Sequence, residues 1–215
     1  DGVVDTYAGS GSQGSMDNPN PVSASFYQPM GLTIDANDNL YVTDTGNNLI
    51  RKVSSGGGVT TIAGNGESGT VDGTASEASF NAPNDVEIDQ WGNLFTVSRY
   101  SHSIRLITPD GQVSTLVGGN GPGNIDGSVQ AAMFNTPVSL AMSPDGELFI
   151  SDERNDVFRK ISFKKPVLIG SPEGLVGPYD VELTALAPGG ATATQSFTIN
   201  VLDRTPPAFS SPAQV

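Results

Sequence analysis

Hydrophobic and polar residues alternate along most of this chain in short runs that end at turn-forming residues. Runs such as Leu40–Asp44 and Leu49–Val53 are rich in β-branched and aromatic residues, and clusters of Gly, Asn, Asp and Pro separate them. This pattern predicts short β-strands joined by tight turns. No run of strong helix formers is long enough to make a helix. We therefore expect an all-β fold.

The same positions recur every 54 residues. The recurring residues include Phe26, Phe80 and Phe134, and also Arg51, Arg105 and Arg159. Three strand patterns belong to each repeat, and a fourth follows at Val59–Ala63 and at 113–117, each time before a Gly-rich link. A fixed period indicates a repeat architecture, and four short strands per unit are typical of a propeller blade. We predict blades near residues 26–63, 80–117 and 134–161.

These repeats resemble NHL repeats, a β-propeller family. The family's Asn-His-Leu triplet falls at positions 47–49, 101–103 and 155–157, where none of the three matches fully, but the surrounding pattern matches over residues 3–163. The resemblance implies a propeller of four-stranded blades. It implies no single activity, because the family includes protein-binding, RNA-binding, scaffolding and lyase members.

The third repeat ends at Ile161 without a fourth-strand pattern, whereas the N-terminus carries one. Since closed propellers have about four to eight blades, three blades predict an incomplete ring. We expect residues 3–9 to be an outer strand donated to the third blade of another subunit. The donated residues are Val3, Val4, Asp5, Thr6, Tyr7 and Ala8. The acceptor residues are Val157, Phe158, Arg159, Lys160 and Ile161. The alternative is that the chain is a fragment with further blades upstream.

A different pattern follows residue 163. Two alternating stretches near 178–187 and 193–203 flank a Pro-Gly-Gly turn and predict a hairpin. It resembles the last strands of immunoglobulin-like modules of the cadherin or HYR type, so we place a partial immunoglobulin-like β segment at 164–204. The Pro-rich tail 205–215 should be extended, either as a linker or as an intermolecular strand. Its possible contact residues are Pro206, Pro207 and Phe209.

Composition narrows the classes of partner and reaction. The net charge of −13 argues against nucleic acid, because phosphate backbones are also negative. The chain has no Cys and no apolar stretch long enough to span a membrane. Its one histidine, His102, cannot build a three-His zinc site such as that of lyase-type relatives, and no nucleophile elbow or phosphate loop is present. We therefore expect no enzyme and no cofactor.

Several charged and aromatic positions are candidates for specific roles. We expect the three repeated arginines to form structural ion pairs with an acid or carbonyl of a neighbouring blade; the alternative is a ligand-facing basic ring. Asp44 and Asp152 end the second strand of their repeats and should cap turn amides. Asp17, Asp72 and Asp126 lie at equivalent places in the links and are weak candidates for calcium. Trp91 lies in a turn, where it could contact a ligand.

Together these features predict a non-enzymatic, secreted or cell-surface structural module that associates with itself by strand exchange, as in a filament or an appendage. The chain starts at Asp1 without Met or a signal peptide, which suggests a processed or partial chain. One alternative function is a ligand-binding propeller for a protein, peptide or glycan. A propeller lyase or hydrolase is a more distant alternative.

Overall fold

The computed structural model describes residues 2–163, 177–186 and 192–201. The chain divides into two compact units, Asp1–Lys164 and Lys165–Val215. Every pair of strands described is antiparallel, and only isolated bridges are parallel. The only helical elements described are short 3-10 turns. The all-β prediction is therefore confirmed. None of the helices described is long and apolar enough to cross a bilayer.

The first unit contains three sheets, and each is an up-and-down meander. The first sheet has the order β1 (Pro29–Ile34), β2 (Leu40–Asp44), β3 (Leu49–Val53), β4 (Val59–Ala63). The middle sheet consists of β6 (Pro83–Ile88), β7 (Leu94–Ser98), β8 (Ser103–Ile107) and β9 (Gln112–Gly118), with the short β5 (Gly73–Thr74) on the outer edge of β9. The third sheet has only three strands, β10 (Pro137–Met142), β11 (Leu148–Asp152) and β12 (Val157–Ile161).

Local side-chain chemistry fixes the turns within each sheet. The Asp35 carboxylate accepts the backbone N–H groups of Asn37 and Asn39, both at 2.9 Å, and so closes the turn between β1 and β2. Asp89 closes the equivalent turn of the middle sheet. The next turn is a 3-10 helix in all three sheets: η2 (Thr45–Asn47), η3 (Arg99–Ser101) and η4 (Glu153–Asn155). A fourth, η1 (Pro21–Ser23), precedes the first sheet.

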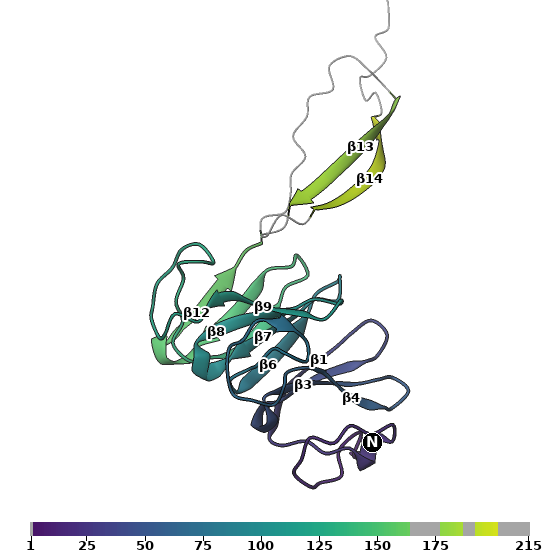
Figure 1. The fold of residues 1–215 in the computed structure, drawn as a ribbon, viewed down its shortest axis with the longest axis vertical. Coiled ribbons are helices and arrows are strands. Elements are labelled where there is room, and N and C mark those ends of the chain that lie inside the picture. Colours follow the sequence, from purple (N-terminus) through teal and green to yellow (C-terminus); the bar gives the residue numbers. More distant parts are fainter. Residues whose placement is uncertain (1, 164–176, 187–191, 202–215) are drawn as a thin grey trace, which may run out of the picture. The chain divides into compact units, whose positions relative to one another are not determined.

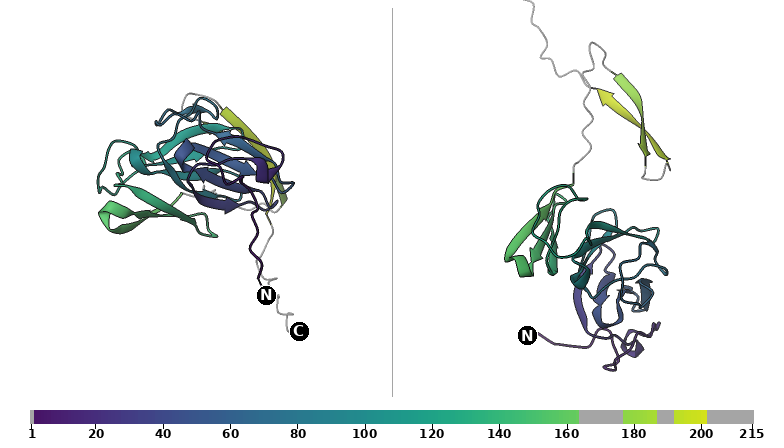
Figure 2. Two further views of the ribbon diagram at one scale, coloured as in Figure 1. Left: turned by 90° about the horizontal axis from the view of Figure 1, so that it is seen from below. Right: turned by 60° about the vertical axis from the view of Figure 1, so that its left-hand side comes forward.

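The three sheets pack face to face in chain order, with the middle sheet between the other two (Figure 1). Ile50 of the first sheet packs with Phe80 and Val86 of the second repeat. Ile104 of the middle sheet packs in the same way with Phe134 and Leu140. Full burial of each such side chain contributes about 1.5–3 kcal/mol. Figure 2 shows the same succession of sheets from two further directions.

The N-terminal segment lies beside the first sheet, at the opposite end of the array from β12 (Figure 1). Residues 2–8 form no strand, and Val3 and Val4 are exposed. Within the described part of this chain no strand covers the outer edge of β12. The predicted donor strand and the predicted acceptor edge are therefore both unpaired within one chain, and they lie too far apart to pair with each other.

The second unit contains a hairpin of β13 (Gly177–Leu186) and β14 (Thr192–Val201), with Gly177 opposite Val201 and Leu186 opposite Thr192. This agrees with the alternating pattern near 178–187 and 193–203. Its assignment to an immunoglobulin-like module stays a prediction. Residues 205–215, with the candidate contacts Pro206, Pro207 and Phe209, lie outside the described residues.

Candidate binding surfaces

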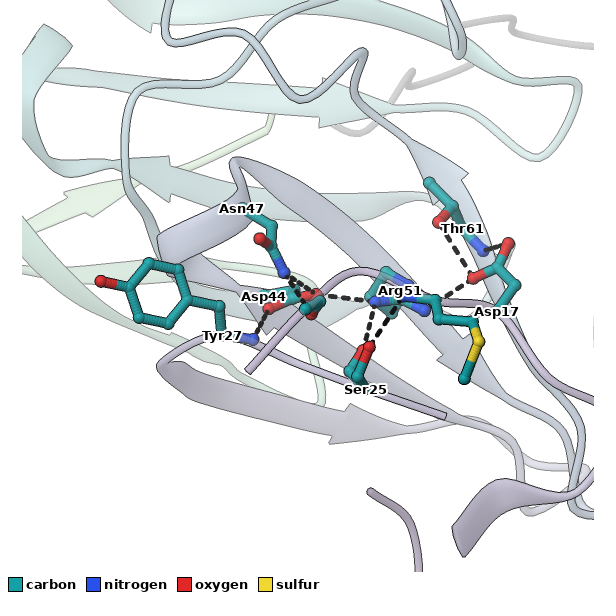
Figure 3. Close-up of polar contacts among 9 residues, drawn as sticks. Asp17, Ser25, Tyr27, Asp44, Asn47, Arg51 and Thr61 are labelled. Carbon is teal, nitrogen blue, oxygen red and sulfur yellow. Dashed lines mark hydrogen bonds and ion pairs between the residues drawn. The ribbon is translucent and has the colours of Figure 1, made fainter. Parts of the chain in front are cut away.

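A buried arginine organises the first sheet (Figure 3). Arg51 on β3 is fully buried, and its guanidinium donates to the Asp44 carboxylate at 2.7 Å and to the Asp17 carboxylate at 2.6 Å. It also donates to the Ser25 carbonyl at 3.1 Å and lies 5.0 Å from the centre of the Phe26 ring. A buried cation is tolerated only when it is paired and hydrogen-bonded, and the two terminal nitrogens of Arg51 meet that condition, while its Nε has no partner among the described residues.

The two carboxylates also fix the backbone around Arg51. Asp44 accepts the backbone N–H of Tyr27 at 2.7 Å and the side-chain amide of Asn47 at 2.8 Å. It makes no side-chain capping bond to the backbone of η2, so the expectation that it caps turn amides is wrong. Asp17 accepts both the N–H and the hydroxyl of Thr61 on β4, at 2.9 and 3.1 Å. Asp17 thereby ties the link that enters the repeat to the outer strand of the same sheet.

The arrangement recurs in the other two repeats. Arg105 pairs with Asp72 at 2.8 Å, and Arg159 pairs with Asp126 at 2.6 Å and with Asp152 at 3.3 Å. The acids come from the arginine's own repeat, not from a neighbouring blade as the sequence pattern led us to expect. In the first and middle sheets the reason is that the Gly-rich link runs along the outer edge of the sheet it enters, as β5 does beside β9.

These pairs bear on two further expectations. Asp17, Asp72 and Asp126, the weak calcium candidates, each hold an arginine, and the described residues contain no group of three or more His, Cys, Asp or Glu side chains suited to a metal ion. A ligand-facing basic ring is also disfavoured, because the Arg51 and Arg105 side chains are fully buried.

The middle sheet lacks one member of this network. Ser98 occupies the place of Asp44 and Asp152, and its hydroxyl is buried without a partner among the described residues. The Nε atoms of Arg51 and Arg105 are both buried without a partner in the described part of the chain, so that feature does not distinguish the middle sheet. Burial lowers the pKa of Arg105, although the Asp72 carboxylate opposes this effect. The middle repeat therefore keeps its arginine with one carboxylate instead of two.

A hydrogen bond from a side chain to the next repeat joins adjacent sheets. Asn48 Oδ1 accepts the backbone N–H of Ala82 at 3.0 Å, and His102 Nδ1 accepts that of Thr136 at 2.9 Å. From the sequence, we considered His102 as a metal ligand and missed this contact. The signal was present, since Asn48 and His102 occupy the same position of successive NHL triplets. Asp156 is the third residue at that position, and it is exposed.

The two ends of the array expose positions that are buried in its interior. Ile50 and Ile104 are fully buried, whereas the equivalent Phe158 on β12 is 86% exposed. At the other end Leu32 on β1 is 63% exposed, whereas its equivalents in the other two sheets, Val86 and Leu140, are 1% and 6% exposed. Each end therefore presents one half of an interface that the chain already forms twice.

A third surface is formed by the turns that follow the first strand of each sheet. A depression of about 350 Å³ is lined by Thr33, Glu87, Trp91 and Met142 among others, and the Trp91 ring is exposed beside it. Burial and the neighbouring Asp85 carboxylate raise the pKa of Glu87. An exposed aromatic ring next to carboxylates and a backbone turn offers both stacking and hydrogen bonding to a ligand.

Comparisons with known proteins agree with the repeat geometry. The NHL repeat family model matches residues 26–53. Human NHL repeat-containing protein 2 is 29% identical over 197 residues, which cover 82% of this chain and 27% of the human protein. The Arabidopsis thaliana protein SUPPRESSOR OF QUENCHING 1, chloroplastic, is 27% identical over 176 residues, which cover 77% of this chain and 17% of that protein. The chain thus spans well under a third of these two relatives.

A solved structure shows the same fold. The crystal structure of an auxiliary nutrient binding protein from Bacteroides ovatus is similar, with a TM-score of 0.58 and 23% sequence identity, over 68% of this chain and 40% of that one. Similarity at this level concerns the architecture alone. The family model, the NHL-repeat relatives and the stacked antiparallel sheets together support the placement of this chain in the NHL-repeat β-propeller family.

Proposed function

We propose that this chain is a non-enzymatic, protein-binding propeller module whose partner is a second copy of the chain. The observation that carries the proposal is the exposure of Phe158 at a position where Ile50 and Ile104 are fully buried. The position is buried in both junctions between sheets, so its exposure on the third sheet leaves one copy of that junction without a partner sheet among the described residues.

The two open faces complement one another because both derive from the same repeated interface. In each internal junction, a residue equivalent to Phe158 packs on residues equivalent to Phe26 and Leu32. A third sheet of one copy would therefore pack against the first sheet of another. Such a head-to-tail contact closes into a ring if the rotation permits, and otherwise continues as a filament.

Light scattering on the purified full-length chain tests this proposal. We expect an oligomer, and Phe158→Ser should shift its mass toward the monomer, because burial of a Phe contributes about 1.5–3 kcal/mol to each contact. Tyr100→Ser is the matched control, since Tyr100 is also an exposed aromatic residue but lies in a turn of the middle sheet. A monomeric wild-type chain, or equal behaviour of the two variants, would refute self-association.

Ligand binding by the depression beside Trp91 is the second candidate function, with a peptide or glycan as the ligand. It is favoured by the exposed indole and the neighbouring Glu87 carboxylate. Screening of glycan and peptide arrays with wild type and Trp91→Ala separates it from the first. A saturable ligand that is lost in Trp91→Ala, together with a monomeric mass, would favour this second function. The expectation that the chain is secreted stays a prediction.

A further inference from the structure

A slot for one strand lies along the free edge of the third sheet. In the middle sheet the outer strand β9 is hydrogen-bonded on both edges, by β8 on one side and by β5 of the incoming link on the other. The first sheet repeats this, because Asn18 of its link bridges Val59 of β4. In the third repeat the equivalent space is a cleft of about 500 Å³.

The walls of this cleft are the counterparts of the elements that flank β9 in the middle sheet. One wall is β12 from Arg159 to Ile161, and the other is the link at Asp126–Ala132. That link folds as its counterpart in the middle repeat does: Ala131 and Ala132 donate to the Ser128 carbonyl just as Glu77 and Ala78 donate to that of Thr74. Among the described residues, the third sheet therefore lacks only the outer strand that the other two sheets have.

We infer that residues 3–8 of a second copy of this chain fill the slot, in a register that the other two sheets define. This inference rests on the proposed self-association and specifies the residues that form the contact. In the middle sheet Val113 lies opposite Ile107, and Thr115 lies opposite Arg105. By equivalence Val4 lies opposite Ile161, Asp5 opposite Lys160, Thr6 opposite Arg159 and Ala8 opposite Phe158.

The segment that follows residues 3–8 is already held as it would be after such a strand. Gly9 donates to the Pro21 carbonyl at 2.9 Å, and Gly64, which follows β4, donates to the equivalent Ala75 carbonyl at 2.8 Å. Both glycines have φ of +104°. Ala8 also packs against the first sheet, as Ala63 packs against the middle one. Residues 3–8 therefore precede the first sheet in the chain just as the outer strand of one sheet precedes the next sheet.

Three side chains of the segment match the slot. Thr61 and Thr115 donate to Asp17 and Asp72, both at 3.1 Å, and Thr6 is their equivalent, facing Asp126. The Asp126 side chain is 92% exposed, against 45% and 52% for the other two.

Val4 is 99% exposed, although its equivalents Val59 and Val113 are buried. Asp5 would lie opposite Lys160, which already pairs with Glu147 at 2.8 Å, and would add a second carboxylate to that pair. The second copy's N-terminal strand is thus the occupant that best completes the third sheet.

Disulfide cross-linking tests this register without background, because the chain has no cysteine. The double variant Asp5→Cys with Lys160→Cys should form intermolecular disulfides under mild oxidation. The variant Thr6→Cys with Lys160→Cys is the matched control, since a shift of one residue places the two side chains on opposite faces. Equal cross-linking of the two variants would overturn the register.

A second measurement separates this inference from self-association itself. Full-length Val4→Asp should donate its strand poorly but keep the slot, so a labelled peptide of residues 2–9 should bind it saturably in fluorescence anisotropy. The same peptide with Val4→Asp should bind at least about tenfold more weakly, because it would bury a charge. If light scattering shows an oligomer but neither peptide binds, the strand inference fails alone; if the wild-type chain is monomeric and neither peptide binds, both proposals fail.

Discussion

Replacement of His102 should weaken the contact between the middle and third sheets and remove part of its dependence on pH. The Nδ1 atom of His102 accepts the backbone N–H of Thr136 at 2.9 Å, and Thr136 is buried. In His102→Ala that N–H loses its acceptor in a place that water reaches poorly. An unsatisfied buried donor costs about 1–3 kcal/mol, so the free energy of unfolding should fall by that amount.

The chain itself supplies the matched control for this prediction. Asn48 occupies the same repeat position and accepts the N–H of Ala82 at 3.0 Å from the same left-handed backbone, with φ of 54° against 55° for His102. Asn is among the residues that adopt this conformation most readily. His102→Asn should therefore keep the bond and stay within about 0.5 kcal/mol of wild type near pH 8.

The two variants separate the hydrogen bond from the protonation of the ring. Burial lowers the pKa of His102 in the folded chain; Asp152 opposes this shift and Arg154 adds to it. Since the folded-state pKa lies below the unfolded value near 6.5, the neutral ring's contribution is complete above that pH. It is lost as the pH falls from there through the lowered folded-state pKa. His102→Asn should lack this loss.

Urea unfolding at pH 8 and pH 5.5, followed by circular dichroism and by the fluorescence of the single Trp91, measures both effects. The two proteins differ only at residue 102, so the difference between their pH dependences reports the loss of the histidine. The reasoning is refuted if wild type and His102→Asn lose the same stability between the two pH values, or if His102→Ala is as stable as His102→Asn.

Two other substitutions test the polar contacts within single sheets. Ser98→Asp gives Arg105 the second carboxylate that the arginines of the other repeats have. It should raise the free energy of unfolding by about 1–2 kcal/mol, measured by urea denaturation. A decrease would show that burial of the new charge destabilises the fold more than the new ion pair stabilises it. Asp35→Ala removes the acceptor for Asn37 and Asn39 and should cost about 1–2 kcal/mol at pH 7. Burial raises the pKa of Asp35, but hydrogen bonds from Asn39, Asn37 and Tyr41 outweigh it and hold the pKa at about 2. The extra stability of wild type over Asp35→Ala should therefore disappear as the pH falls from about 4 to 2. A constant difference in stability during acid denaturation would contradict this.

The repeat period carries most of what could be predicted from the sequence. Alternation and turn chemistry place strands such as β2 and β3 to within a residue, because both depend only on neighbouring side chains. The period also identifies the third sheet as lacking an outer strand. It does not identify β5, since the two residues Gly73 and Thr74 pair with β9 only once the link folds back along that edge.

Contacts across the array were harder to foresee. Asp44 and Asp152 lie only 7 residues before their arginines, whereas Asp17 and Asp72 lie 34 and 33 residues before theirs, in links whose path the strand pattern does not specify. The junction bond was missed for a related reason, because Asn48 and His102 look like turn residues when each is considered alone. Both bonds span 34 residues, so a search for polar residues at a constant offset between repeats would have found them.

Repeat proteins generally need polar faces on their terminal units, because an exposed apolar end promotes association. In this array the end positions depart from that rule: Phe158 is larger than the buried Ile50 and Ile104, and Leu32 is as apolar as the buried Val86. If these ends faced solvent in the working protein, a polar residue in place of Phe158 or Leu32 would not destabilise either of the two internal junctions. Retention of apolar side chains at both ends, together with the cleft of about 500 Å³ beside β12, therefore argues that each end packs against another sheet of the same kind.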